Sequence, residues 1–376
     1  MRRLPGLDLL RAIAIVWVML FHSYIIGGWH EPFRNLENFG WMGVDLFFVL
    51  SGYLIGSQLL KPLSEGRPLA LMQFYLRRAF RILPVYFVVL ALYFSWPAFR
   101  EQPGIQPLWQ FVTFTVNLLI DTDHNLAFSH VWSLCVEEHF YLVFPCLAWW
   151  LTRRPSTGKF IGVCLVVLIG GMTLRWSIWT HWLAPVIHQD AYNARFLEGI
   201  YYPTWSRLDG LLAGVMLATI KIYRQALWAR LQTHANGLML LGLFIVACAI
   251  ALFRDRAGLL STVIGYPLLS SGLAFVVMAG SSTQSWLGKL KIPGAGWLAL
   301  TSYSLYLSHK AVLHLADNLL GAQLAGHTAL AFFVYALAVL MVGGILYYAV
   351  EQPFLKLRER LSTRRRNKLC SSRAPA

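Results

Sequence analysis

The 376-residue sequence is poor in acidic side chains and in cysteine. It has 17 Asp and Glu against 32 Lys and Arg, and only 13% of its residues are charged while 57% are hydrophobic. Because soluble domains carry about 25% charged residues, this composition excludes an ordinary soluble domain and indicates a polytopic membrane protein. The five cysteines, at 135, 146, 164, 248 and 370, form no Cys-x-x-Cys pair, which argues against a disulfide framework or a zinc site.

Several sequence motifs of hydrolytic enzymes are also missing. The chain has no His-Glu-x-x-His, no phosphate-binding Gly-rich loop and no Gly-x-Ser-x-Gly. These absences disfavour zinc hydrolysis and nucleotide hydrolysis, and no metal is expected. Ser51 and Ser133 are the nearest candidates for a nucleophilic serine, but serines of this kind more often serve helix packing.

Long apolar segments, by contrast, are abundant. A membrane-spanning helix needs about 20 predominantly apolar residues, and ten segments approach that length. We therefore predict an all-α bundle of about ten transmembrane helices, at 7–28, 40–60, 82–99, 131–151, 160–179, 203–222, 236–253, 258–280, 297–316 and 328–350. The segment 107–120 is too short to span comfortably and is predicted to be interfacial or re-entrant. We expect the first segment to be an uncleaved helix, because Arg11 interrupts it.

The distribution of basic residues predicts the orientation of these helices. With the N-terminus in the cytoplasm, the cytoplasmic segments carry 23 Lys and Arg and the external connections carry 5. This asymmetry follows the positive-inside rule and predicts that both termini are cytoplasmic. The net charge of +15 is then mostly membrane-leaflet charge, so no nucleic-acid partner is expected. We predict a membrane domain over 1–357 and a basic cytoplasmic tail over 358–376.

Ionisable residues inside the predicted spans point to a functional site, since such residues are costly in a membrane. Arg11 and His22 lie eleven residues apart on nearly the same face of the first helix, ~16 Å apart along its axis. A snorkelling arginine and a structural histidine would also explain this pair. Other spans, however, bring ionisable groups to a similar depth, which predicts a shared polar cavity with His22: Asp45, Glu137, Glu138, Arg207, Asp209 and His309.

A second basic group lies near the predicted cytoplasmic side. Arg78 and Arg81 share a helix face, and together with Arg11 they have the chemistry to bind a phosphorylated ligand; ordinary positive-inside charge is the alternative explanation. A neutral imidazole such as His22 can act as a general base on an alcohol. A carboxylate such as that of Asp45 could fix its tautomer, as in hydrolase triads.

Several motifs in the chain resemble those of the acyltransferase-3 family of integral membrane acyltransferases. The spacing of Arg11 and His22, ten residues between them, is similar to that family's signature, and Arg78 with Arg81 matches its Arg-x-x-Arg. The other matching stretches, in order, are GVDLFFVLSGYLI at 43–55, WSLCVEEHFYLVFP at 132–145, SRLDGLLAG at 206–214, YSLYLSHKAV at 303–312 and EQPFLKL at 351–357. The resemblance covers nearly the whole chain, although Cys135 stands where a serine is common.

The resemblance implies ten transmembrane helices in a bacterial inner membrane and transfer of an acyl group, usually acetyl from cytoplasmic acetyl-CoA. The acceptor would be a hydroxyl of an extracytoplasmic or lipid-linked carbohydrate. Because the predicted tail is short, we expect no fused hydrolase-like domain, so the protein would act alone or pass the acyl group to a separate extracytoplasmic partner.

The same resemblance assigns roles to residues. His22 would be the catalytic base with Arg11 as its essential partner, oriented by Asp45 or Glu137, and acetyl-CoA would be held by Arg78, Arg81 and Arg11. The hydroxyl would attack the thioester directly, or the acyl group would pass through an acyl-histidine. The acceptor glycan would be contacted by Trp132, Glu138, Arg207, Asp209 and His309.

Two other classes of protein also carry intramembrane charges. A transporter or flippase of a lipid-linked glycan or other anion would use a midplane cavity, but no matching pair of Gly/Pro-interrupted spans is evident. A lipid-linked glycosyltransferase would normally need an acidic metal-binding loop or a large external domain. Turnover of a CoA thioester distinguishes the acyltransferase from both.

Overall fold

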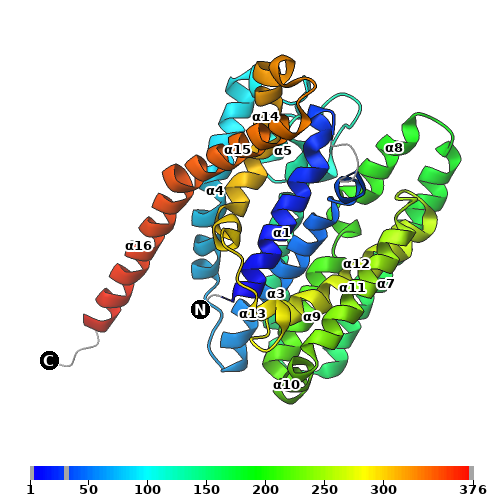
Figure 1. Cartoon of the computed structure of the whole chain (residues 1–376). Helices are drawn as coiled ribbons and strands as arrows, with labels where there is room; N and C mark the ends of the chain where they lie inside the picture. The colour runs from blue at the N-terminus through cyan, green and yellow to red at the C-terminus, as the bar shows by residue number, and fades with distance from the viewer. Residues whose placement is uncertain (1–3, 29–33, 372–376) are drawn as a thin grey trace. The chain divides into compact units, whose positions relative to one another are not determined.

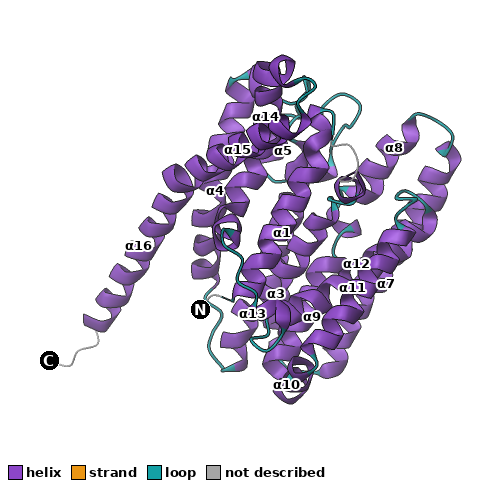
Figure 2. Ribbon diagram, in the orientation of Figure 1, coloured by secondary structure: helices purple, strands orange, loops and turns teal. Residues whose placement is uncertain are grey.

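The computed structural model describes residues 4–28 and 34–371, and these residues form helices joined by short turns and loops (Figure 2). No β-strand occurs among them; the one β-bridge joins Ile105 and Ala127. The all-α prediction is confirmed. The predicted tail 358–376 runs past the described residues, and its predicted start lies inside the last helix, α16 (Gln352–Ser371).

Within the described residues, eight helices are long and apolar enough to cross a membrane, and they support a multi-pass membrane protein. Each overlaps a predicted span: Pro5–Ile26, Met42–Ser64, Leu71–Ser95, Ser129–Arg153, Thr157–Val186, Ala235–Leu252, Ser261–Gly280 and Thr328–Leu361. The other two predicted spans are also helical, but α9 (Asp209–Tyr223) has only 15 residues, and α14 (Ala295–Leu324) includes several polar side chains. The segment 107–120 forms only a short helix, α5 (Leu108–Val112), and a turn.

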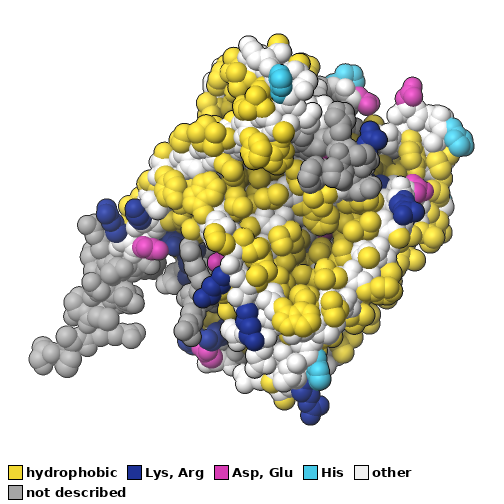
Figure 3. Space-filling model, viewed as in Figure 1, with side chains coloured by type: hydrophobic (Ala, Val, Ile, Leu, Met, Phe, Trp, Pro, Cys, Tyr) yellow, Lys and Arg dark blue, Asp and Glu magenta, His cyan; other side chains and the backbone are white. Residues whose placement is uncertain are grey.

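Hydrophobic side chains cover much of the visible surface (Figure 3). Large apolar residues such as Val166, Phe244, Phe333 and Ile345 are each more than 60% exposed on the predicted spans. In water this exposure would be unfavourable, whereas in a bilayer the lipid chains solvate these groups. The surface therefore agrees with the membrane assignment.

The chain forms two compact units, and the described residues of the first are 4–24, 28, 34–69 and 102–300. At its centre lies α3 (Met42–Ser64), which contacts α9, α1 (Pro5–Phe21), α12 (Tyr266–Gly280) and α6 (Trp132–Arg153). Toward its periphery are α7 (Thr157–Ile178) and α11 (Ala235–Leu252), and α11 lies beside α12 (Figure 1). Shorter helices complete this unit: α2 (Arg34–Asn38), α8 (Ala191–Phe196), α10 (Gln225–Thr233) and α13 (Trp286–Lys289).

Glycine allows α3 and α9 to approach closely. A Cβ atom on Gly52 would overlap the carbonyl oxygen of Leu211, and one on Gly214 would overlap the carbonyl oxygen of Val49. Small residues spaced four apart are the usual means by which helices pack at short distance in membranes. This contact fixes the start of α3, which carries Asp45, against the start of α9, which carries Asp209.

The described residues of the second unit are 25–27, 70–101 and 301–371. It contains α4 (Leu71–Ser95), most of α14, α15 (Thr328–Leu346) and α16. A hydrogen bond from the Tyr303 hydroxyl to the carbonyl oxygen of Ile82, 2.9 Å long, joins α14 to α4.

Candidate active site

His22 lies directly after the last residue of α1, in a 3₁₀ turn that continues the same apolar span, Pro5–Ile26. Arg11 lies near the start of α1. Its Nδ1 is 3.0 Å from the carbonyl oxygen of Val18. A carbonyl oxygen can only accept, so Nδ1 carries the proton, and Nε2 of the neutral ring is then the basic nitrogen. The helix that positions His22 thus also sets its tautomer.

The two carboxylates expected to orient His22 have other partners. Asp45 accepts two hydrogen bonds from Nη2 of Arg207, at 2.8 and 3.0 Å, and both side chains are at least 96% buried. Glu137 accepts a 2.6 Å bond from the Tyr141 hydroxyl, which is itself 2.6 Å from Oγ of Ser51. At Nδ1 of His22 the partner is the backbone carbonyl of Val18, and the orientation of His22 by Asp45 or Glu137 stays a prediction. Asp45 instead neutralises a buried arginine, because an unpaired charge there would be costly.

Arg207 is surrounded by aromatic rings. Its guanidinium carbon lies 4.2 Å from the ring centroid of Tyr266, 4.7 Å from that of Tyr201 and 5.2 Å from that of Trp132. Trp132 is 4% exposed, so it packs against Arg207 inside the unit. Both Trp132 and Arg207, predicted to contact a glycan, thus have partners within the protein.

A second buried ion pair lies beside the first. Arg175 donates two hydrogen bonds to Asp209, at 2.8 and 3.1 Å, and a third to the carbonyl oxygen of Ser206 at 2.8 Å. Its guanidinium carbon is 5.6 Å from the ring centroid of Tyr266, which also contacts Arg207. Asp45, Arg207 and Asp209 are therefore held in two neighbouring buried ion pairs, while the polar cavity predicted to include His22 and His309 stays a prediction. The pattern of the sequence gave Arg175 no role, although a lone arginine in an apolar span is itself a signal.

A third arginine, Arg256, approaches the same cluster from the turn after α11. Its guanidinium carbon is 4.3 Å from the ring centroid of Tyr201 and 4.6 Å from that of Trp41. Burial raises the pKa of the Tyr201 hydroxyl, and the charges of Arg256 and Arg207 only partly offset this. Tyr201 is therefore a neutral hydroxyl at physiological pH.

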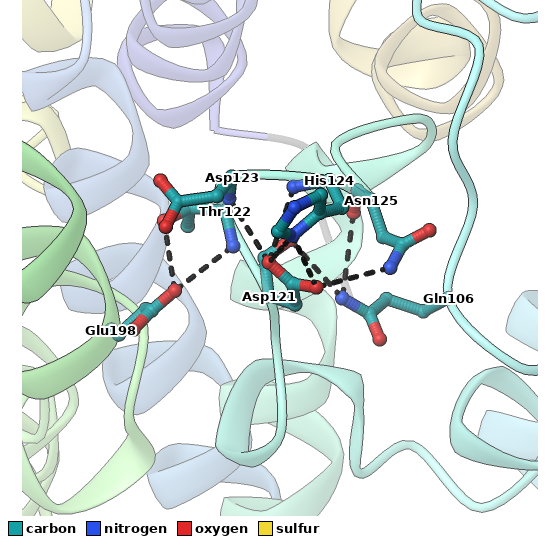
Figure 4. A network of polar contacts seen from close by, with 7 residues as sticks. All are labelled: Gln106, Asp121, Thr122, Asp123, His124, Asn125 and Glu198. Atoms are coloured by element: carbon teal, nitrogen blue, oxygen red, sulfur yellow. Dashed lines mark hydrogen bonds and ion pairs between the residues drawn. The ribbon is translucent and has the colours of Figure 1, made fainter.

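The connection before α6 is an ordered loop (Figure 4). Asp121 accepts hydrogen bonds from the backbone N–H groups of Asp123 and His124, both at 3.1 Å. Glu198 accepts from the backbone and the hydroxyl of Thr122, at 2.9 and 2.8 Å. These bonds hold the loop in place and connect it to Glu198.

His130 is a histidine near His22 that the sequence pattern did not single out. It lies in a 3₁₀ turn, Ser129–Val131, and is 2% exposed. The centroids of the His22 and His130 rings are 6.1 Å apart. The sequence did contain a sign of its importance, since His130 stands two residues before the stretch at 132–145 that matches the family.

In the second unit, Arg78 and Arg81 lie three residues apart within α4, so they share a helix face as predicted. Arg81 is close enough to Glu351 for their charges to interact. Glu351 also accepts a 2.8 Å bond from Ser304. Because Arg11 belongs to the first unit, the clamp predicted from all three arginines stays a prediction.

His309 is fully buried in the second unit, with Nδ1 2.8 Å from the carbonyl oxygen of Tyr306. Next to it in sequence, Lys310 forms a buried ion pair with Glu101 at 2.8 Å. Burial alone would raise the pKa of Glu101, but the charge and hydrogen bond of Lys310, aided by Tyr93, leave that pKa below its usual value. This unit therefore has a buried polar centre of its own. Among the described residues, no group of three or more His, Cys, Asp or Glu side chains is placed to hold a metal ion.

Comparison with known protein families gives a match over residues 4–348, to the acyltransferase domain of the acyltransferase-3 family. The chain belongs to this family. The match begins before α1 and reaches into the segment that follows α15, so it includes every candidate site residue named above. The resemblance inferred from the motifs is confirmed.

Relatives with curated names are distant. A protein of Staphylococcus aureus (strain COL) named "Putative O-acetyltransferase" is 25% identical over 388 residues, which cover 95% of this chain and 58% of that protein. The peptidoglycan O-acetyltransferase OatA of Listeria monocytogenes is 25% identical over 337 residues, covering 84% of this chain and 50% of OatA. The chain thus spans about half the length of these relatives. No solved structure matches it.

Proposed function

We propose that this family member is a membrane-bound O-acyltransferase. In this proposal it moves an acyl group, acetyl in the first instance, from cytoplasmic acyl-CoA to a hydroxyl of an extracytoplasmic or lipid-linked carbohydrate. The observation that carries the proposal is the hydrogen bond of His22: its Nδ1 donates to the Val18 carbonyl oxygen, which leaves Nε2 as the basic nitrogen. The family match over residues 4–348 supports the same activity. A basic imidazole nitrogen at the end of a membrane helix is the group that deprotonation of an alcohol needs.

In the proposed reaction, His22 carries out the proton transfers between the acceptor hydroxyl and the thioester. Nε2 of His22 takes the hydroxyl proton as the oxygen attacks the thioester carbonyl carbon. The carbon–sulfur bond then breaks, and the departing thiolate takes the proton back from the imidazolium. The products are an O-acyl ester and the free thiol of CoA, so atoms and charge balance.

Arg78 and Arg81 are proposed to bind the phosphates of CoA. Two guanidinium groups on one helix face can each make bidentate, charge-assisted hydrogen bonds to phosphate oxygens. Arg11 is proposed to assist them or to support His22. The orientation of the protein, with both termini in the cytoplasm of a bacterial inner membrane, rests on the distribution of basic residues.

The relatives support a carbohydrate acceptor. One of them is named as a peptidoglycan O-acetyltransferase, and peptidoglycan is a glycan outside the cytoplasmic membrane. Glu138, Arg207, Asp209, His309 and Trp132 remain candidates for a role near the acceptor. The buried partners of Arg207, Asp209 and Trp132 favour a role in shaping the site over direct contact.

Release of CoA thiol from acetyl-CoA tests the proposal. The purified protein in detergent or lipid nanodiscs, supplied with envelope glycans, is compared with His22→Ala and Arg78→Ala. His188→Ala and Arg154→Ala, which alter exposed residues of the same types, serve as matched controls.

We expect His22→Ala to lower the turnover number by at least about 100-fold, because general-base catalysis contributes about 10²–10⁴-fold. Arg78→Ala should mainly raise the Michaelis constant for acetyl-CoA, and both controls should behave as wild type. Full turnover by His22→Ala would refute the assigned base. Binding of a lipid-linked glycan without any use of the thioester would favour the transporter.

A further inference from the structure

His130, whose ring lies close to that of His22, is a feature of the first unit that the proposed function leaves unused. The two residues are far apart in sequence, just after α1 and just before α6, yet their ring centroids are 6.1 Å apart with the planes tilted by 59°. Both belong to the same compact unit. Histidine is only occasionally fully buried, and His130 is 2% exposed in surroundings rich in aromatic rings.

The backbone that delivers His130 is held in an unusual conformation. Phe128, two residues earlier, has φ +60°, in the left-handed region that a bulky residue rarely adopts. Its buried ring stacks on Phe111 with centroids 5.7 Å apart and meets the His130 ring edge-on at 5.2 Å. Such strain persists only where the surroundings fix the residue, and it concentrates at functional sites. The stacked phenylalanines thus set the place of the His130 ring.

The separation of the two rings suits one oxygen atom between them. An oxygen within about 3 Å of a nitrogen on each ring is compatible with centroids 6.1 Å apart. A hydroxyl donates one hydrogen bond and accepts others. It can therefore donate to Nε2 of His22 while it accepts from an N–H of His130, since a neutral imidazole always keeps one N–H donor.

We propose that His130 is a second catalytic imidazole, which donates a hydrogen bond to the attacking hydroxyl oxygen and directs the hydroxyl proton toward Nε2 of His22. This proposal rests on the proposed function and adds the subsite for the acceptor hydroxyl. The attacking oxygen keeps one lone pair for the thioester carbon. The proton moves to His22 and then to the CoA thiolate, so His130 is not consumed and the reaction stays balanced.

Two substitutions separate this role from a purely structural one. His130→Phe keeps an aromatic ring to pack against Phe128 but removes the N–H donor. His130→Gln loses the ring but keeps an N–H donor. A packing role predicts that Phe is tolerated better than Gln, whereas the proposed hydrogen bond predicts the reverse.

The experiment measures thiol release from acetyl-CoA by the full-length protein, with water alone and with a soluble oligomer of N-acetylglucosamine as acceptor. Wild type, His22→Ala, His130→Phe and His130→Gln are compared, and thermal unfolding in detergent checks that each is folded. We expect His130→Phe to lose about 100-fold or more in turnover number, the scale of one positioned hydrogen bond in a reaction. His130→Gln should stay within about tenfold of wild type, and the Michaelis constant for acetyl-CoA should not change in either variant.

The outcomes are distinct. If wild type turns over, His22→Ala does not, and folded His130→Phe equals wild type, the role of His130 is refuted while the proposed function stands. A loss that appears only as a higher Michaelis constant for acetyl-CoA also refutes it. If wild type itself never uses the thioester, the proposed function fails and this proposal fails with it.

Discussion

At the scale of single residues, two buried arginines of the first unit each form an ion pair with a buried aspartate. Asp45 with Arg207 and Asp209 with Arg175 each form two hydrogen bonds at 2.8–3.1 Å in surroundings almost without exposure. Removing one member of such a pair leaves the other charge buried without compensation. We therefore expect loss of one partner of a pair to lower the free energy of unfolding strongly.

Asp45→Ala tests this point. We expect it to destabilise the protein by about 3–5 kcal/mol, since it leaves the Arg207 guanidinium buried and unpaired. The double variant Asp45→Leu with Arg207→Met should be closer to wild type, because it removes both charges and keeps an apolar core. Thermal unfolding in detergent is the measurement, with the exposed Asp190→Ala as control. Equal losses in the single and double variants would contradict the account.

The depth of the buried charges could be predicted from the sequence, but their partners could not. The sequence indicated that Asp45, Arg207 and Asp209 lie in one polar layer, because depth in a span follows from residue count. It could not indicate that Asp45 pairs with Arg207, since partners 162 residues apart in sequence depend on how helices are rotated against each other. His130 was missed because it precedes the apolar run, outside the segment where buried charge is conspicuous.

At the scale of elements, the contact of α3 with α9 positions the site. Both helices begin near the ion pairs, and glycines let their backbones meet along the following turns. The short α9 was predicted as a longer span, 203–222, because apolar composition does not register that residues 204–206 form a 3₁₀ turn. That turn is what brings Arg207 and Asp209 to their separate partners.

Gly52→Ala should disrupt this contact. The added methyl group would overlap the backbone of α9, and overpacking of this kind costs about 1–3 kcal/mol. Gly162→Ala in α7 is the matched control, because nothing lies within 4 Å of its added Cβ. We expect that control to be neutral or stabilising by up to ~1 kcal/mol. Unfolding temperatures in detergent that rank the two variants in the opposite order would refute the close approach of α3 and α9.

At the scale of the whole molecule, family membership and helical membrane architecture were both predictable from the sequence and both are confirmed. The motifs that carry the family resemblance lie in both compact units: Arg11 and His22 in the first, Arg78 and Arg81 in the second. In the proposed function, His22 serves the hydroxyl, and Arg78 and Arg81 serve the CoA donor.

Transfer of labelled acetyl groups tests the central claim most directly. Membranes containing wild type or His22→Ala are incubated with acetyl-CoA labelled in the acetyl group, and alkali-labile label is measured in the extracted envelope glycans. We predict ester-linked label on the glycan with wild type and none above background with His22→Ala. Equal labelling by the two proteins, with thiol release to match, would contradict the assignment of His22 as the base of a membrane O-acyltransferase.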